Sequence, residues 1–132
     1  MNHFFICRHC KSVMDGVDSE RELDEDGILQ SKSLSNKIKK LIDENTIIYS
    51  SPFKRAVESL MPLKKEFPSI QINETEYLKE IKIGKSKDLS KHQIIFEMWK
   101  NENFKIDNGE SQTECFDKMK PFLDKVFSEF KD

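Results

Sequence analysis

Two short apolar runs enclose a stretch of helical periodicity in the first part of the chain. Residues 3–7 and residues 46–49 are too short for helices and lack polar alternation, which is the pattern of strands buried on both faces of a parallel sheet. Between them, Asp24 is a plausible N-cap for a helix over residues 25–43. The apolar positions of this helix recur at helical spacing: Ile28, Leu34, Ile38, Leu41 and Ile42. The pattern predicts a βαβ unit with parallel strands, because such crossovers are right-handed.

Three further helices are predicted after the second strand. Ser51-Pro52 combines a capping residue with a proline suited to the first helical turn, so a helix is expected to begin there and to end near Pro68. A short strand over residues 70–72 and a short helix over residues 90–100 follow. Ser111-Gln112-Thr113-Glu114 has the pattern of a capping box for a final amphipathic helix. The apolar positions of that helix are Phe116, Met119, Phe122, Leu123, Val126, Phe127 and Phe130.

The composition is that of one ordinary folded domain. The chain has 132 residues, 36% of them hydrophobic and 35% charged, and no linker or repeat divides it, so a single domain over residues 1–132 is expected. The 22 Lys and Arg residues nearly balance the 24 Asp and Glu residues, which predicts neither nucleic-acid binding nor acidic disorder. No apolar run approaches the roughly 20 residues of a membrane span and no leader is recognisable, so a cytoplasmic protein without a membrane partner is expected.

Basic side chains follow both of the first two predicted strands. Arg8 and His9 come directly after the first strand, and Arg55 lies in the first turn of the helix after the second. Loops and helix N-termini converge beyond the carboxyl ends of parallel strands, where free N–H groups and arginines suit phosphate oxygens. The placement is therefore compatible with a phosphate site. On spacing alone, two solvated arginines and a histidine used for capping or packing are the favoured alternative, because any two such strand–helix junctions converge.

Cysteines permit a different chemistry at the same place. Cys7 and Cys10 form a Cys-x-x-Cys pair directly after a strand, the position of a thioredoxin-like redox motif. Against this, Cys7 completes an apolar run, and no thioredoxin-like order of elements follows. A zinc site lacks a second ligand pair at suitable spacing, and the odd count of three cysteines favours free thiols, so neither a metal nor a cofactor is expected.

Five segments, in the right order, resemble motifs of the histidine phosphatase (phosphoglycerate mutase-like) superfamily. The family motifs are Arg-His-Gly-Glu-Thr/Ser, Leu-Thr-x-x-Gly-x-x-Gln, Ser-Ser-Pro-x-x-Arg-Ala-x-x-Thr, Leu-x-Glu-x-x-x-Gly and a later Gly-Glu-Ser. The matching segments here begin at Arg8, Leu23, Ser50, Leu78 and Gly109. The resemblance implies an α/β fold of three layers, α/β/α, around a mostly parallel central sheet.

The resemblance also implies a role for each matching residue. His9 would attack phosphorus and become phosphohistidine, Arg8 and Arg55 would hold the phosphoryl oxygens, and Ser12 would help to close the pocket. Glu80 would protonate the leaving oxygen and then activate water. The implied activity is a phosphatase acting on a phosphorylated small molecule, in preference to a mutase, because mutases of the family carry additional segments over the pocket.

Two departures from the family pattern support a second function. Cys10 stands where the family has glycine, close to the phosphate, and the Ser-His-Gly turn with the second catalytic histidine does not appear before Asp132. A homologue that binds phosphate or a phosphorylated ligand without turnover is therefore the alternative. The family strand that pairs beside the first strand is also not found, so an exposed sheet edge is expected, and with it a homodimer through residues 3–7 and the final helix.

Overall fold

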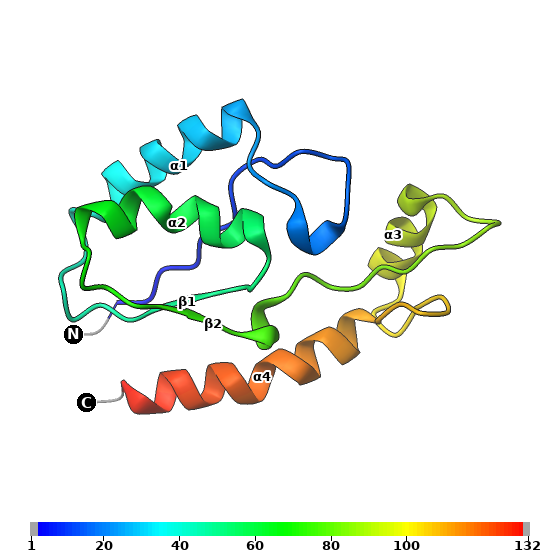
Figure 1. Ribbon diagram of the computed structural model, residues 1–132. Helices are drawn as coiled ribbons and strands as arrows, with labels where there is room; N and C mark the ends of the chain where they lie inside the picture. Colours follow the sequence, from blue (N-terminus) through cyan, green and yellow to red (C-terminus); the bar gives the residue numbers. More distant parts are fainter. Residues whose placement is uncertain (1–2, 131–132) are drawn as a thin grey trace. The chain divides into compact units, whose positions relative to one another are not determined.

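The computed structural model describes residues 3–130, which fold into α-helices and a two-stranded parallel sheet (Figure 1). This confirms the predicted α/β class. The described residues divide into two compact units, one spanning Phe4–Lys79 and the other formed by His3 together with the residues from Glu80 onward. No helix within residues 3–130 combines the length and the apolar character that a membrane crossing requires.

The first unit contains α1 (Glu25–Ile38), β1 (Ile48–Ser50), α2 (Lys54–Glu66) and β2 (Ile72–Glu74). Strands β1 and β2 are parallel, with Ile48 opposite Ile72 and Ser50 opposite Glu74. The crossover between them is α2, and α1 packs against α2 (Figure 1). The observed βαβ unit is therefore β1-α2-β2, one step later along the chain than the predicted one.

Residues 3–7 do not form the predicted strand, which is a correction to the sequence pattern. The segment is coil, with Phe4 and Phe5 about half exposed and Ile6 94% exposed. A strand exists only as part of a hydrogen-bonded ladder, and within residues 3–130 the sheet consists of β1 and β2. An apolar run shows a preference for burial, but it does not supply the partner. The homodimer predicted through this segment remains a prediction.

Helix boundaries follow local capping chemistry. Asp24 is the N-cap of α1, where its carboxylate accepts from the Gly27 N–H at 2.8 Å, as predicted. The helix ends at Ile38, earlier than predicted, and a turn follows in which the Asp43 carboxylate accepts from the Asn45 N–H at 2.9 Å. An Asp side chain that bonds the backbone two residues on favours a turn over continued helix.

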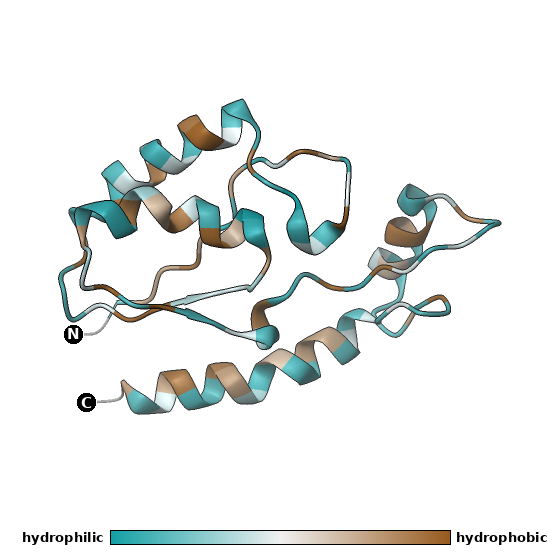
Figure 2. Cartoon of the chain, viewed as in Figure 1, coloured by the Kyte–Doolittle hydropathy of each residue, from teal (hydrophilic) through white to brown (hydrophobic). Residues whose placement is uncertain are grey.

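The second unit contains α3 (Lys91–Lys100) and α4 (Gln112–Glu129). Both begin with a complete capping box, formed by Ser90 with Gln93 and by Ser111 with Glu114. The box at Ser111 confirms the predicted start of the final helix. Apolar and polar positions alternate around α4, as the colours of Figure 2 show, yet none of its described residues is fully buried.

Two short motif segments meet in this second unit. The Glu110 N–H donates to the Lys82 carbonyl at 2.6 Å, and the Glu110 carboxylate accepts from the Lys82 N–H at 2.9 Å. Gly84 has a φ of +83°, which favours glycine, and a side chain on Gly109 would meet the Ile83 carbonyl oxygen at 2.6 Å. The glycines are therefore explained by this close backbone approach.

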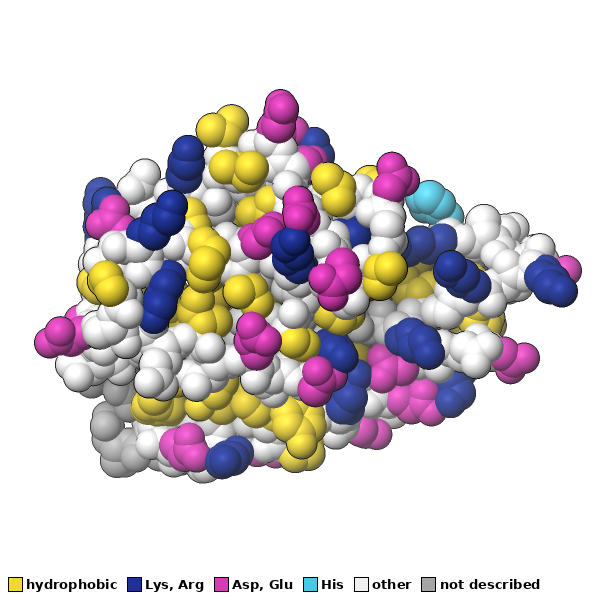
Figure 3. Space-filling model, viewed as in Figure 1, with side chains coloured by type: hydrophobic (Ala, Val, Ile, Leu, Met, Phe, Trp, Pro, Cys, Tyr) yellow, Lys and Arg dark blue, Asp and Glu magenta, His cyan; other side chains and the backbone are white. Residues whose placement is uncertain are grey.

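Positive and negative side chains are interspersed on the face of the molecule shown in Figure 3. The pattern agrees with the formal net charge of −2.

Candidate active site

The loop that carries His9 is anchored to the segment that leads into α1. Ser12 and Leu23 form an antiparallel bridge, and the Val13 N–H donates to the Glu22 carbonyl at 2.9 Å. The Lys11 carbonyl accepts from the Asp24 N–H at 3.1 Å. The residues that follow His9 are thus held by backbone hydrogen bonds although residues 3–7 are coil.

Helix α1 supports the same loop through two residues of the Leu-x-x-x-Gly-x-x-Gln segment. Gln30 accepts from the Lys11 N–H through its side-chain oxygen at 2.9 Å. Gly27 lies against the Lys11 carbonyl, so closely that a Cβ on Gly27 would overlap the carbonyl oxygen and stand 2.9 Å from the carbonyl carbon. Glycine and glutamine at these positions therefore serve to place the loop after His9.

Helix α2 ties this loop to Arg55. The buried Ser59 hydroxyl accepts from the Cys10 N–H at 2.8 Å and donates to the Arg55 carbonyl at 2.7 Å. Ser59, one helical turn after Arg55, thus connects the residue after His9 with the backbone of Arg55. On the same helix, Glu58 accepts from the Leu23 N–H at 2.8 Å.

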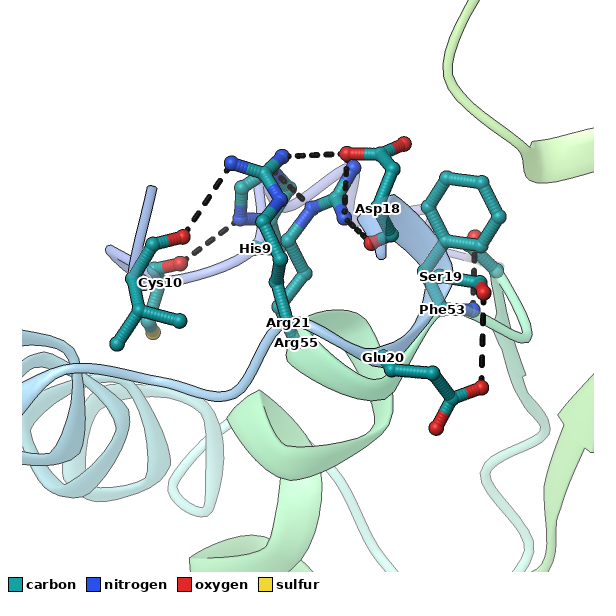
Figure 4. Close-up of polar contacts among 10 residues, drawn as sticks. His9, Cys10, Asp18, Ser19, Glu20, Arg21, Phe53 and Arg55 are labelled. Atoms are coloured by element: carbon teal, nitrogen blue, oxygen red, sulfur yellow. Dashed lines mark hydrogen bonds and ion pairs between the residues drawn. The ribbon is translucent and has the colours of Figure 1, made fainter. Parts of the chain in front are cut away.

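His9 and Arg55 are brought together, as predicted from the sequence (Figure 4). Arg55 is 1% exposed, and its Nε–H donates to His9 Nε2 at 3.4 Å. His9 Nδ1 lies 2.8 Å from the Cys10 carbonyl oxygen. A carbonyl can only accept, so Nδ1 carries the proton and, in the neutral ring, Nε2 carries the lone pair. The nitrogen that carries the lone pair therefore faces the guanidinium group.

Asp18 and Arg21 complete the polar cluster, and the sequence pattern did not point to either. Arg55 Nη1 donates to the Asp18 carbonyl at 2.6 Å and to the Asp18 carboxylate at 3.4 Å. Arg21 Nη2 lies 2.7 Å from the same carboxylate oxygen. Figure 4 shows the carboxylate reached by both guanidinium groups. The sequence offers one clue to Arg21, which is the scarcity of arginine: Arg8, Arg21 and Arg55 are the only arginines of the sequence.

The other predicted site residues are placed differently. Arg8 is exposed and has no hydrogen bond or ion pair with the residues that the structure describes. Ser12 is buried in the bridge with Leu23. Glu80 is an exposed residue of the second unit, and its catalytic role remains a prediction.

The Cys7 thiol does not have the lowered pKa of a reactive redox thiol. Burial raises the pKa of the Cys7 thiol above its ordinary value, and the neighbouring Cys10 raises it further. A reactive thiol needs a lowered pKa, because the thiolate is the nucleophile. Within residues 3–130, no cluster of three His, Cys, Asp or Glu side chains could hold a metal ion.

Comparison with known proteins decides the family. The model of the histidine phosphatase superfamily (branch 1) matches residues 4–132. The chain belongs to this superfamily. No match was found among curated proteins.

Two solved structures share the fold of this chain. A mycobacterial glucosyl-3-phosphoglycerate phosphatase in complex with inorganic phosphate superimposes with a TM-score of 0.74 at 18% identity, covering 92% of this chain and 61% of that chain. A protein described as mycobacterial hydrolase 1 has the same TM-score and identity, with 92% and 63% covered. This chain therefore spans less than two thirds of the length of either protein.

Proposed function

We propose that this chain is a histidine phosphatase domain that hydrolyses a phosphate monoester through a phosphohistidine at His9. The observation that carries the proposal is the position of His9 Nε2, which faces Arg55 Nε at 3.4 Å while Nδ1 is held by the Cys10 carbonyl. The family membership supports the reaction class. The mycobacterial neighbour, by its name a glucosyl-3-phosphoglycerate phosphatase, supports a phosphate monoester as the class of substrate.

The first chemical step forms a bond between His9 Nε2 and phosphorus. The phosphorus–oxygen bond to the leaving group breaks, and Glu80 donates a proton to the departing oxygen. Arg55 offers its guanidinium donors to the phosphoryl oxygens, which carry the developing charge. Arg8 is exposed beside His9 and is the proposed second cation on these oxygens. The hydrogen bond from Nδ1 to the carbonyl keeps the ring in the required tautomer.

The second step transfers the phosphoryl group to water. Glu80, now deprotonated, takes a proton from the attacking water as the bond between Nε2 and phosphorus breaks. Inorganic phosphate leaves, and His9 returns to its neutral form. Ser12 is the remaining residue proposed for the pocket. It is buried two residues after Cys10, where its hydroxyl is suited to support the loop.

Phosphorylation is expected on the nitrogen that faces Arg55. After reaction with an aryl phosphate or a phosphoramidate and rapid alkaline quenching, mass spectrometry should place one phosphoryl group on His9. Phosphorus NMR of the digested peptide should show attachment to Nε2, because Nδ1 is occupied by the Cys10 carbonyl. Attachment to Nδ1, or to a different residue, contradicts the proposal.

Replacement of Glu80 by glutamine is expected to separate the two steps. An aryl leaving group needs little proton donation, so labelling of His9 should continue, whereas attack by water should slow by about 10²–10⁴-fold. The phosphoenzyme should therefore accumulate in Glu80→Gln when followed by quenched-flow mass spectrometry. The matched control is Glu76→Gln, a nearby glutamate paired with Lys79, which should behave as the wild type. Equal accumulation in both variants refutes the role of Glu80.

A phosphate-binding homologue without turnover is the second candidate. Cys10, at the position of the family glycine, is buried directly after His9, and this observation favours it. The two candidates give different results with an aryl phosphate. Binding of inorganic phosphate without any labelling of His9 is the result expected for the homologue without turnover.

A further inference from the structure

Two guanidinium groups share one carboxylate in the first unit. Asp18 Oδ1 lies 2.7 Å from Arg21 Nη2 and 3.4 Å from Arg55 Nη1. Arg55 in turn reaches His9 Nε2 through its Nε. The Arg55 guanidinium group therefore lies between the Asp18 carboxylate and the His9 imidazole, which is the proposed nucleophile (Figure 4).

Arg21 is built into the fold and is not a free surface charge. Its side chain is only 15% exposed, and its Nη1 donates to the Val13 carbonyl at 3.3 Å. Its Nε is buried and has no hydrogen-bond partner among the described residues. Buried donors without an acceptor are rare in native proteins and call for a specific explanation. The guanidinium group is thus fixed in place while its donors are only partly used.

The choice of arginine at this position is itself informative. Only three of the 22 basic residues are arginines, and every other basic position is lysine. A planar guanidinium group binds carboxylate and phosphate oxygens in a fixed geometry that lysine does not provide. Two of the three arginines share the Asp18 carboxylate, and the third precedes His9.

Asp18 is held mainly through its backbone. The carbonyl of Asp18 accepts from Arg55 Nη1 at 2.6 Å, a shorter contact than that of its carboxylate with the same nitrogen. The side chain is 60% exposed and lies in a single 3-10 turn, Asp18–Glu20. The carboxylate can therefore rotate into solvent while the backbone contact with Arg55 is kept.

We propose that Arg21 is a second oxyanion-binding arginine of this site and that the Asp18 carboxylate occupies the place between Arg21 and Arg55 that a phosphate oxygen takes when phosphate binds. This inference rests on the proposed function, because it assigns the ligand of the same site. Phosphate binding exchanges an intramolecular carboxylate for a phosphate oxygen on the same two cations. Asp18 and phosphate therefore compete.

Titration with inorganic phosphate at constant ionic strength tests the competition. Affinity is measured by calorimetry for the wild type, Arg21→Gln, Arg21→Lys, Asp18→Asn and the double variant Asp18→Asn/Arg21→Gln. We expect Arg21→Gln to weaken binding about tenfold, with partial recovery in Arg21→Lys. Asp18→Asn should tighten binding about threefold or more, and this gain should disappear when Arg21 is also replaced.

Lys39→Gln is the matched control, because it removes one positive charge at the C-cap of α1, at the opposite end of that helix from Asp24. Its phosphate affinity should equal that of the wild type. An equal loss in Lys39→Gln and Arg21→Gln, unchanged affinity in a folded Arg21→Gln, or weaker binding in Asp18→Asn each overturns the inference.

The Nε–H signals of the three arginines give a second readout, which is measured on the wild type. Each signal is assigned by replacing one arginine with lysine, and phosphate should shift those of both Arg21 and Arg55 in the wild type. Shifts at Arg55 and Arg8 with none at Arg21 overturn this inference and leave the proposed function standing. Absence of phosphate binding in the wild type and in Asp18→Asn defeats both.

Discussion

Replacement of His9 by glutamine should lower the turnover of an aryl phosphate by at least about 10³-fold, because the proposed nucleophile is lost while the shape of the side chain is nearly kept. Phosphoryl labelling should vanish at the same time. Binding of inorganic phosphate should change far less, since Arg55 is held by Asp18 and by its own helix. Turnover, labelling and calorimetry on one preparation measure the three quantities.

His92 supplies the matched control for this experiment. It is an exposed residue in the first turn of α3, in the other unit, so His92→Gln should retain wild-type labelling and turnover. A phosphoryl group that is still present in His9→Gln would show that a different residue accepts it. The proposed function would then be wrong.

Substitution of Gly27 by alanine is the structural change with the largest expected effect. Alanine normally favours a helix by about 1 kcal/mol over glycine. Here its Cβ would overlap the Lys11 carbonyl oxygen, which is already bonded to the Asp24 N–H. We expect a net loss of about 1–3 kcal/mol in the free energy of unfolding, measured by urea denaturation, because backbone overlap cannot be relieved by a rotamer change.

The loop that carries His9 should also move in Gly27→Ala, so labelling should fall in the fraction that remains folded. Ser33→Ala is the control on the same helix, at an exposed position where alanine should leave stability unchanged or raise it slightly. Equal stabilities of Gly27→Ala and Ser33→Ala would show that the loop after His9 yields easily. In that case the close packing of Gly27 against the Lys11 carbonyl is not essential for the stability of the fold.

Helices were predictable because their signals are local. The Asp24 cap and the capping box at Ser111 each involve residues within three positions of one another, and both form as the sequence indicates. The end of α1 was misplaced because the apolar spacing continues past Ile38, whereas the chain turns at residues 39–41, where the Leu41 N–H donates to the Ile38 carbonyl at 2.8 Å. The turn is local too, but its signal competes with the helical one.

The strand over residues 3–7 could not be predicted in the same way. Strand formation depends on a partner distant in sequence, so an apolar run such as Phe4, Phe5 and Ile6 indicates only a preference for burial. Likewise, the meeting of His9 and Arg55 followed from motifs, but the Asp18 and Arg21 contacts arise from a short 3-10 turn whose residues carry no periodic signal. Only the scarcity of arginine indicated Arg21.

The Ser59 hydroxyl links the loop after His9 to α2 and not to residues 3–7. It accepts from the N–H of the residue after His9 and donates to the carbonyl of Arg55, so one side chain on α2 bonds to the backbone on both sides of the candidate site. Residues 3–7 can therefore change their own partners, by pairing with another strand or remaining coil, while the spacing of His9 and Arg55 is preserved.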